Sequence, residues 1–371
     1  MRGIMPYPHS AVYACLRPPT SDLRPPASGL DLRPPTSDLR ADSSALPRPL
    51  QLQTPDGWVM VWDMNEASLR RVMVLVNPKS GLAWSFDAMR RAFDRHWETL
   101  PGVELAYQFT QGIEDGERKA RLCVADGVDT VIVVGGDGTL STIGRILVDT
   151  EVALGVVPAG SGNGFARHFG ISLTPEKAIA QLATAQRQGI DVGRVNGKPF
   201  FVTSSMAWDA SIVSGFERLP VRGILPYVFA GVEEFFEYRP QPMQVVLDGD
   251  ESLSFNNALV FTVANMTQFG GGARIAPHAR ANDGQLELVV ALRQDIAKLV
   301  TNITRLFDGS LSKLPEVVFR SFRSMHLTRE EATPIQVDGE LMECGKEIEV
   351  TVSQAGLQVL VPGGRGADAH L

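Results

Sequence analysis

Three glycine-rich segments in the first half of the sequence have the composition of phosphate-binding turns. They are Asn77–Gly81, Gly135–Ser141 and Gly160–Arg167. Glycine tolerates positive φ and lets the backbone approach a phosphate closely, while the free N–H groups at a helix start favour negative charge. Any one of these segments is explained equally well as a tight turn. Three of them in succession favour a shared site for a phosphate group.

The same segments exclude two common nucleotide-binding motifs. The sequence contains no GxxxxGK[ST], so the chain is not a P-loop protein. Gly136, Gly138 and Ser141 lack the third glycine of GxGxxG, and no acidic residue follows at the distance that holds a ribose. A dinucleotide dehydrogenase is therefore disfavoured.

The flanking elements place the three segments at one edge of a sheet. Apolar runs predict strands at Val72–Val76, Val103–Phe109, Thr130–Val134 and Ala153–Val157. Helical periodicity predicts helices through Phe86–Trp97, Gly116–Ala125 and Ile143–Leu147. Strands that alternate with helices indicate an α/β fold, a doubly wound parallel sheet covered on both faces. Ligands of such sheets bind at the carboxyl ends of the strands, where all three segments fall.

A change of periodicity near residue 194 predicts a second domain. A helix that starts at Thr174-Pro175 is expected to end at Gly189, and Asn196-Gly197 is a hairpin signal. Further strands are predicted at Met243–Leu247, Ala258–Ala264, Leu286–Ala291, Ile335–Asp338, Glu347–Val352 and Leu357–Val361, with helical segments around Leu225–Tyr238 and Asp295–Leu306. We therefore expect a parallel-sheet nucleotide-binding domain over residues 67–193 and a β-rich β-sandwich domain over residues 194–363.

The first 66 residues differ in composition from the rest of the chain. They are rich in proline, and the sequence LRPPTSDLR at Leu16–Arg24 recurs unchanged at Leu32–Arg40. Such a segment buries too little apolar surface to offset the entropy of ordering it, so a disordered tail is predicted. A partner-binding polyproline tail, or a start codon assigned upstream of Met64, are alternatives.

Net charge, cysteine spacing and the lengths of the apolar runs exclude several classes of protein. The net charge of −7 over 371 residues argues against a nucleic-acid partner, which would need a basic face. Cys15, Cys123 and Cys344 are widely spaced, so neither a disulfide framework nor a zinc site is expected, and a reducing cytoplasm fits. No apolar run of 18 residues occurs, so no segment is expected to span a bilayer, and any contact with a membrane would be peripheral.

Seven short motifs, in order, carry a resemblance to a known family. They are VLVNPKSG at 74–81, VGGDGTL at 134–140, PAGSGN at 158–163, Asp191-Val192-Gly193, Asp209-Ala210, Ala281-Asn282-Asp283-Gly284 and Val337-Asp338-Gly339-Glu340. Each is weak alone, but the ordered set resembles the diacylglycerol kinase catalytic-domain family, which includes bacterial lipid kinases, sphingosine kinases and ceramide kinases. The resemblance covers about residues 70–362.

The resemblance implies an ATP-dependent lipid kinase that uses Mg²⁺. Residues matching the ATP-binding positions are Asn77, Pro78, Ser80, Gly81, Thr110, Gly135, Gly136, Asp137, Gly138, Thr139, Leu140, Ser141, Gly160, Ser161, Gly162 and Asn163. Asp137 would face the magnesium-bound triphosphate through water. ATP and a lipid substrate at a membrane surface would be the partners, in lipid metabolism or phospholipid biosynthesis, and a homodimer is left open.

The resemblance also implies a general base and a metal site. Glu340, with Asp338 beside it, resembles the carboxylate pair that takes the proton from the lipid hydroxyl. A positioned general base contributes roughly 10²–10⁴-fold to such a reaction. Asp283, with the backbone carbonyls of Arg280 and Gln285, would hold a structural Mg²⁺, which prefers oxygen ligands. Asp338-Gly339 and Asn282-Asp283-Gly284 are also sequences typical of simple turns.

Departures from the family pattern leave the acceptor open. Ser161 and Gly164 stand where the bacterial branch usually has Thr and Asp, and the third motif looks more like that of sphingosine kinases. A diacylglycerol-like and a sphingoid- or ceramide-like acceptor are both compatible. The apolar segment Gly223–Phe236 is a candidate wall for a lipid pocket, with internal packing as the alternative.

Two other functions are weighed against the lipid kinase. An NAD kinase would share GGDGT, but the Asn-Glu pair with which that family holds NAD is missing after the third predicted strand. A non-catalytic lipid-binding regulator would be expected to have lost the phosphate loop or the base, and both Asp137 and Glu340 are present.

Overall fold

The computed structural model describes residues 50–54, 57–61, 70–81, 85–208, 210, 238–292, 298, 302 and 304–363. Two strands fall within the tail for which disorder was predicted: β1 (Leu50–Thr54) pairs antiparallel with β2 (Gly57–Val61), with Thr54 opposite Gly57. This hairpin belongs to a unit separate from the one that begins at Arg70. Everything below concerns the second unit.

A parallel sheet forms the first half of this unit, as predicted. Its strands are β3 (Arg70–Val76), β4 (Val103–Phe109), β5 (Thr130–Gly135) and β6 (Ala153–Pro158), in the order β6-β5-β3-β4. Every residue of β5 and β6 is buried, which explains why both strands are apolar throughout. All three crossovers between these strands carry a helix, so the sheet is of the α/β type.

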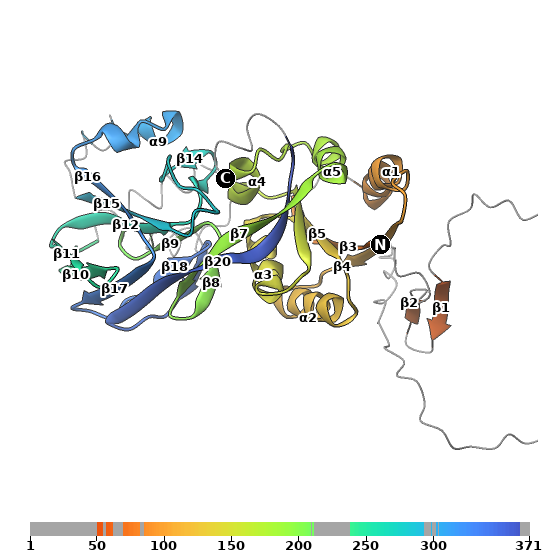
Figure 1. The fold of residues 1–371 in the computed structure, drawn as a ribbon, viewed down its shortest axis with the longest axis horizontal. Helices are drawn as coiled ribbons and strands as arrows, with labels where there is room; N and C mark the ends of the chain where they lie inside the picture. The colour runs from red at the N-terminus through yellow and green to blue at the C-terminus, as the bar shows by residue number, and fades with distance from the viewer. Residues whose placement is uncertain are drawn as a thin grey trace, which may run out of the picture. The chain divides into compact units, whose positions relative to one another are not determined.

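Helices cover both faces of the parallel sheet (Figure 1). One face carries α1 (Phe86–Trp97) and α5 (Pro175–Ala183), and Trp97 Nε1 joins them by donating to the carbonyl of Ile179 at 3.0 Å. On the other face α2 (Ile113–Ala125) packs against α3 (Asp137–Leu147). A short helix, α4 (Gly164–His168), follows β6. The doubly wound arrangement is thereby confirmed.

The prediction that the fifth helix extends to Gly189 is wrong. Helix α5 ends at Ala183, and β7 (Gln186–Val195) begins three residues later. Pairing decides this segment, because β7 lies antiparallel to β20 (Glu347–Val361) along most of its length. A partner strand from the far end of the sequence cannot be read from local periodicity.

Strands β7 and β20 run side by side from the β-rich half into the parallel sheet (Figure 1). Near its end β20 pairs parallel with β6, with Val359 opposite Leu154, while its beginning pairs with β17 (Ser324–Arg329). The boundary predicted at residue 194 thus falls inside β7. One continuous ten-stranded sheet connects the two halves of the molecule.

The β-rich half is built around two packed sheets. The first is the remainder of the ten-stranded sheet, which adds β8 (Lys198–Phe200), β10 (Met243–Leu247) and β11 (Glu251–Phe255). The second sheet has the order β16-β15-β12-β9-β18-β19, from Val317–Phe322, Leu286–Leu292, Ala258–Ala264, Thr203–Ser205, Ile335–Val337 and Glu340–Met342. Smaller elements are β13 (Gln268–Gly270), β14 (Ala273–Arg274), α9 (Arg305–Asp308) and the 3₁₀ turn η1 (Leu311–Lys313).

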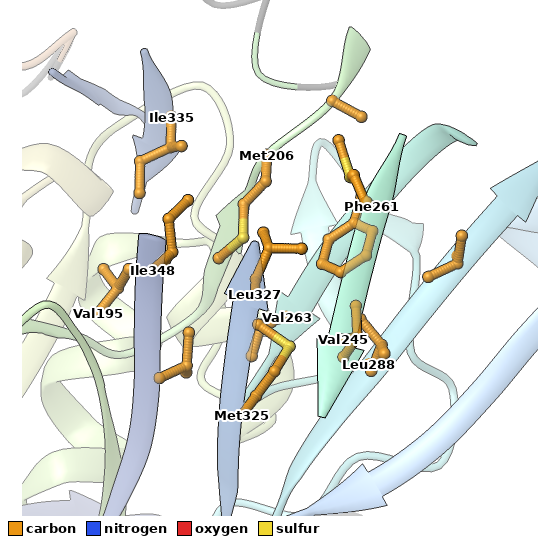
Figure 2. Close-up of a cluster of buried hydrophobic side chains, with 14 of the residues drawn as sticks. Val195, Met206, Val245, Phe261, Val263, Leu288, Met325, Leu327, Ile335 and Ile348 are labelled. Atoms are coloured by element: carbon orange, nitrogen blue, oxygen red, sulfur yellow. The ribbon is translucent and has the colours of Figure 1, made fainter. Parts of the chain in front are cut away.

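An apolar core fills the space between these two sheets. Figure 2 shows Val263 and Leu288 from the second sheet with Leu327 and Ile348 from the first, all fully buried. Each of these four comes from a strand whose inward residues alternate with outward ones, the pattern of sheet-on-sheet packing. The expected β-rich domain is confirmed.

Several local predictions need adjustment. The strands predicted at Glu347–Val352 and Leu357–Val361 are one strand, β20, with a shift of register between Ser353 and Leu357. The strand predicted to include Asp338 ends at Val337, because Asp338 has a φ of 50° and forms a turn. The segment Gly223–Phe236, nearly all of Leu225–Tyr238, Asp209 and much of Asp295–Leu306 lie outside the described residues. Among the helices described, none has the length and apolar character needed to cross a membrane.

Candidate functional site

The three predicted loops meet at the carboxyl edge of the parallel sheet. Asn77 donates its backbone N–H to the carbonyl of Val134 at 3.0 Å and its side-chain Nδ2 to Thr139 Oγ1 at 2.7 Å. The third loop approaches the second so closely that a Cβ on Gly160 would lie 2.7 Å from the Cα of Gly136. Only glycine permits that contact. The loops therefore form one cluster around the start of α3.

The first loop is shaped by its own hydrogen bonds. Asn77 Oδ1 accepts from the N–H of Lys79 at 3.0 Å, and Ser80 Oγ donates to the carbonyl of Asn77 at 2.6 Å. This turn, with Pro78 inside it, continues to Gly81. Thr110 lies beside it, because its N–H donates to the carbonyl of Val76 at 2.8 Å.

The third loop is shaped mainly by Asn163. Its Oδ1 accepts from the N–H of Gly160 at 3.0 Å, and its Nδ2 donates to the carbonyl of Gly160 at 2.7 Å. Asn163 adopts a left-handed conformation with φ of 52°, which Asn tolerates better than most residues. Its side chain thus closes the turn, whereas Ser161 at the tip is exposed.

Asp137 joins the second loop to the third. Its carboxylate accepts from the N–H of Gly164 at 3.0 Å and from the N–H of Phe165 at 3.3 Å. Burial raises the pKa of Asp137, and these two N–H groups together with the nearby Arg167 charge oppose that rise. The carboxylate expected to face a magnesium-bound triphosphate is therefore directed at the start of α4.

One face of α3 carries contacts to the acids of the β-rich half. Ser141 Oγ donates to Asp338 Oδ2 at 3.1 Å, and Arg145 Nη1 pairs with Glu340 Oε2 at 2.7 Å. Asp137, Ser141 and Arg145 are spaced by four residues, so they lie on the same side of the helix. Because a helix rises about 1.5 Å per residue, Glu340 meets α3 roughly 12 Å from the Asp137 end. The second loop, Asp338 and Glu340 thus all lie along the same side of α3.

Asp338 and Glu340 differ sharply in their surroundings. Asp338 accepts from the N–H groups of Phe201 at 2.9 Å, Val202 at 2.8 Å and Thr203 at 3.2 Å, in addition to Ser141. Four donors occupy the roughly four lone-pair positions of a carboxylate. Burial raises the pKa of Asp338, and the N–H groups of Val202 and Phe201 oppose the rise. The geometry suits a carboxylate that fixes the chain around it.

Glu340 is the accessible member of the pair. Its side chain is 32% exposed and interacts with Arg145 at 2.7 Å and with Lys198 Nζ at 3.5 Å. Arg145 is itself held by a hydrogen bond from Nε to the carbonyl of Pro199 at 3.2 Å. Arg145 of α3 and Lys198 of β8 thus hold the Glu340 carboxylate in place.

The predicted metal site contains oxygen atoms of the kind that Mg²⁺ prefers. Asp283 Oδ1 accepts from the N–H of Gln285 at 3.0 Å, within the loop that also contains Arg280. Burial raises the pKa of Asp283, and the neighbouring Asp191 carboxylate adds to the rise. A cation would relieve this repulsion between carboxylates, so the residues fit Mg²⁺. Within the described residues, no group of three or more His, Cys, Asp or Glu side chains is arranged to hold a metal ion, at Asp283 or elsewhere.

Sequence reasoning missed three basic residues of this region. Arg145 and Lys198 contact Glu340, and Arg167 lies on the third loop, where its Nε donates to the carbonyl of Gly162 at 3.1 Å. The spacing of Arg145 from Asp137 along a predicted helix could have placed it on the site face. No local pattern could have assigned Lys198, because its contact depends on the fold of the second half.

Comparisons with known proteins agree with this architecture. The family described as "Diacylglycerol kinase catalytic domain" matches residues 71–195, and the one described as "YegS C-terminal NAD kinase beta sandwich-like domain" matches residues 204–361.

Whole proteins and solved structures show the same relationship. A diacylglycerol kinase of Mycobacterium tuberculosis is 31% identical over 313 residues, which cover 81% of this chain and 99% of that protein. The diacylglycerol kinase of Bacillus subtilis is 25% identical over 289 residues, or 73% of this chain and 90% of that one. The crystal structure of a diacylglycerol kinase from Bacillus anthracis has the same fold, with a TM-score of 0.60 and 19% identity over 80% of this chain and 98% of that one. Because the two families match in this order along the chain and the Mycobacterium tuberculosis protein is 31% identical over 99% of its own length, this chain belongs to the diacylglycerol kinase catalytic-domain family.

Proposed function

We propose that the protein transfers the γ-phosphoryl group of ATP to the hydroxyl of a lipid acceptor, either diacylglycerol or a sphingoid- or ceramide-like lipid, at a membrane surface. The observation that carries this proposal is the face of α3. The helix begins in the glycine-rich second loop and, two turns later, Arg145 pairs with Glu340 at 2.7 Å. A phosphate site and an accessible carboxylate on one helix face are what phosphoryl transfer to an alcohol requires.

Each group then has a distinct task. The three loops hold the triphosphate through backbone N–H groups and the hydroxyls of Thr139 and Ser161, and Mg²⁺ on the triphosphate offsets its charge when bound. Glu340 accepts the proton of the attacking hydroxyl. Asp338 is the positioning residue, because its four hydrogen bonds fix the turn that carries Glu340.

A lipid-panel assay tests this function. The purified full-length chain is incubated with labelled Mg-ATP and mixed micelles containing diacylglycerol, a sphingoid base or ceramide, with NAD in a parallel arm, and products are resolved by mass. We expect one lipid class to be phosphorylated and NAD to remain unchanged. Phosphorylation of NAD alone would assign the NAD kinase activity instead, and lipid binding without turnover in any arm would assign a regulator.

A further inference from the structure

A loop of three glycines from the β-rich half lies against the third loop. Gly270, Gly271 and Gly272, called here the triglycine loop, have φ angles of 141°, 59° and 94°. Side chains disfavour such backbone conformations, so the sequence GGG matches the geometry. A Cβ placed on Gly162 would lie 3.9 Å from the amide nitrogen of Gly271 and 3.0 Å from Asp137 Oδ2. The triglycine loop therefore faces the same cluster of loops as Asp137.

Arg167 lies between the third loop and the triglycine loop. Its Nε donates to the carbonyl of Gly162 at 3.1 Å, and its Nη1 is 3.7 Å from the position of a Cβ on Gly272. Its positive charge also opposes the rise that burial causes in the pKa of Asp137. The Nε bond uses one of the five donors of the guanidinium, and the planar group can present two others to a phosphate at once.

A buried polar atom without a partner lies at the base of the same loop. Gln268 lies two residues before Gly270 and is 6% exposed. In the part of the chain that the structure describes, its Oε1 has no hydrogen-bond partner. Its Nε2 donates to Thr267 Oγ1 at 3.3 Å, and its Cβ is 3.5 Å from the position of a Cβ on Gly164, next to Asn163. Buried polar atoms are nearly always paired, so Oε1 of Gln268 is an exception among the described residues.

We propose that Arg167 and the triglycine loop form one wall of the triphosphate site, with Arg167 binding the terminal phosphate of the nucleotide. The inference rests on the proposed function, since it assumes that the three loops bind a nucleoside triphosphate. The triglycine loop places no side chain between Arg167 and the ligand, which gives a physical reason for three consecutive glycines. The β-rich half thereby contributes to nucleotide binding as well as to the acceptor side.

The first test compares nucleotides that differ by one phosphate. Dissociation constants of ATP, ADP and adenosine, with Mg²⁺ present, are measured by calorimetry on the full chain, on Arg167→Ala and on Arg167→Lys. Loss of a hydrogen bond to a charged group predicts about 10- to 100-fold weaker ATP binding in Arg167→Ala. Adenosine affinity should be unchanged, and the ATP-to-ADP ratio should fall by a similar factor. Arg167→Lys keeps the positive charge but loses the paired N–H donors of the guanidinium, so an intermediate loss of ATP affinity is expected.

The outcomes separate this inference from the function beneath it. If the unaltered chain binds ATP no better than adenosine, the three loops do not bind the triphosphate and the proposed kinase function is wrong. If the unaltered chain prefers ATP and both Arg167 variants keep its ATP-to-ADP ratio, the kinase function stands and the role of Arg167 is wrong. Arg320→Ala, which removes an exposed arginine that contacts Glu251 on a distant strand, should leave all three constants unchanged.

The second test isolates the triglycine loop. Gly272→Ala introduces a methyl group at φ of 94°, and Gly249→Ala does the same at φ of 85° on the β10–β11 hairpin, where a Cβ meets nothing within 4 Å. Both substitutions should lower the melting temperature by similar amounts, because both force a side chain into a left-handed conformation. Only Gly272→Ala should weaken ATP binding. Equal ATP affinity in the two variants would remove the loop from the nucleotide site.

Discussion

At the residue scale, the carboxylates of this site are distinguished by what surrounds them. Asp137 and Asp338 are directed at backbone N–H groups, whereas Glu340 is partly exposed and held by two cations. Sequence spacing alone groups Asp338 with Glu340 because they are two residues apart. The structure separates them, because Asp338 is buried with four hydrogen-bond donors whereas Glu340 is partly exposed.

Glu340→Gln tests the proton acceptor. The substitution keeps the shape of the side chain but removes its basicity, so kcat for lipid phosphorylation should fall roughly 10²–10⁴-fold. The Kd for ATP and the melting temperature should change little, because the carboxylate is partly exposed. Glu343→Gln, an exposed acid three residues further on, serves as the matched control and should retain full activity. Unchanged turnover in Glu340→Gln would remove this residue from the mechanism.

Cys123 provides a pH-dependent test of the core. The side chain is buried in α2 at 4% exposure, and burial raises the pKa of its thiol to about 12. An unfolded thiol ionises near pH 8.5, so above that pH the native state holds more protons than the unfolded state. The contribution of Cys123 to stability should therefore decrease as pH rises from about 8.5 toward 12.

Alkylation measures the protection of Cys123 directly. Iodoacetamide at pH 8.5, followed by peptide mass analysis, should label Cys123 only after unfolding in guanidinium. Rapid labelling of Cys123 in the native protein would contradict the burial described here.

At the element scale, α3 connects the two halves of the site. Its first residue is Asp137, its second turn holds Ser141 against Asp338, and its third holds Arg145 against Glu340. The helix also packs tightly on the β8–β9 connection, since a Cβ on Gly144 would lie 2.9 Å from the Phe201 ring. A shift of α3 would therefore move the second loop and the acids together.

Arg145→Ala tests this connection. Without its partner the Glu340 side chain gains freedom, and misplacement by about 1 Å can cost on the order of 10²-fold in rate. We expect kcat to fall by about 10- to 100-fold, with a smaller change in the KM for ATP. Arg194→Ala is a suitable control, because Arg194 pairs with Asp149 at the same 2.7 Å distance outside the site. Similar losses in both variants would indicate general destabilisation and would refute a specific role for Arg145.

At the scale of the whole molecule, the paired strands β7 and β20 join the parallel-sheet half to the β-rich half. They pair over most of their lengths, and β20 contacts β17 in the β-rich half and β6 in the parallel sheet. Asp191 of β7 strengthens this joint, since its carboxylate accepts from the N–H of Gly284 at 2.6 Å and of Ala355 at 3.0 Å. The cluster of loops and acids lies beside this joint, so its geometry depends on both halves.

Because the β7–β20 strand pair belongs to both halves, we expect the two halves to unfold cooperatively. A Cβ on Gly193 of β7 would lie 2.1 Å from the Phe200 ring. Gly193→Ala should therefore disturb the β7–β20 pair and lower the free energy of unfolding by about 1–3 kcal/mol. Hydrogen exchange should show the same loss of protection in β5 and in β12, because one structure supports both. Loss confined to β12 would show that the halves unfold independently.

The sequence determined most of the parallel-sheet half and the identity of the loops. Apolar runs, helical periodicity and glycine turns are local signals, so β4, β10 and β12 were predicted with the bounds that the structure shows. The predicted helix from Pro175 to Gly189 was too long because its last residues form β7, and β7 is a strand through its pairing with the distant β20, which is not a local signal.

Only the tertiary structure decided how the site is divided among its residues. The saturation of Asp338 by four donors, the clamp of Arg145 and Lys198 on Glu340, and the contact of the triglycine loop with the third loop all join residues far apart in sequence. Burial and hydrogen-bond partners are properties of such long-range contacts. Residue types fix which chemistry is available, and the packing of the two halves fixes which residue performs it.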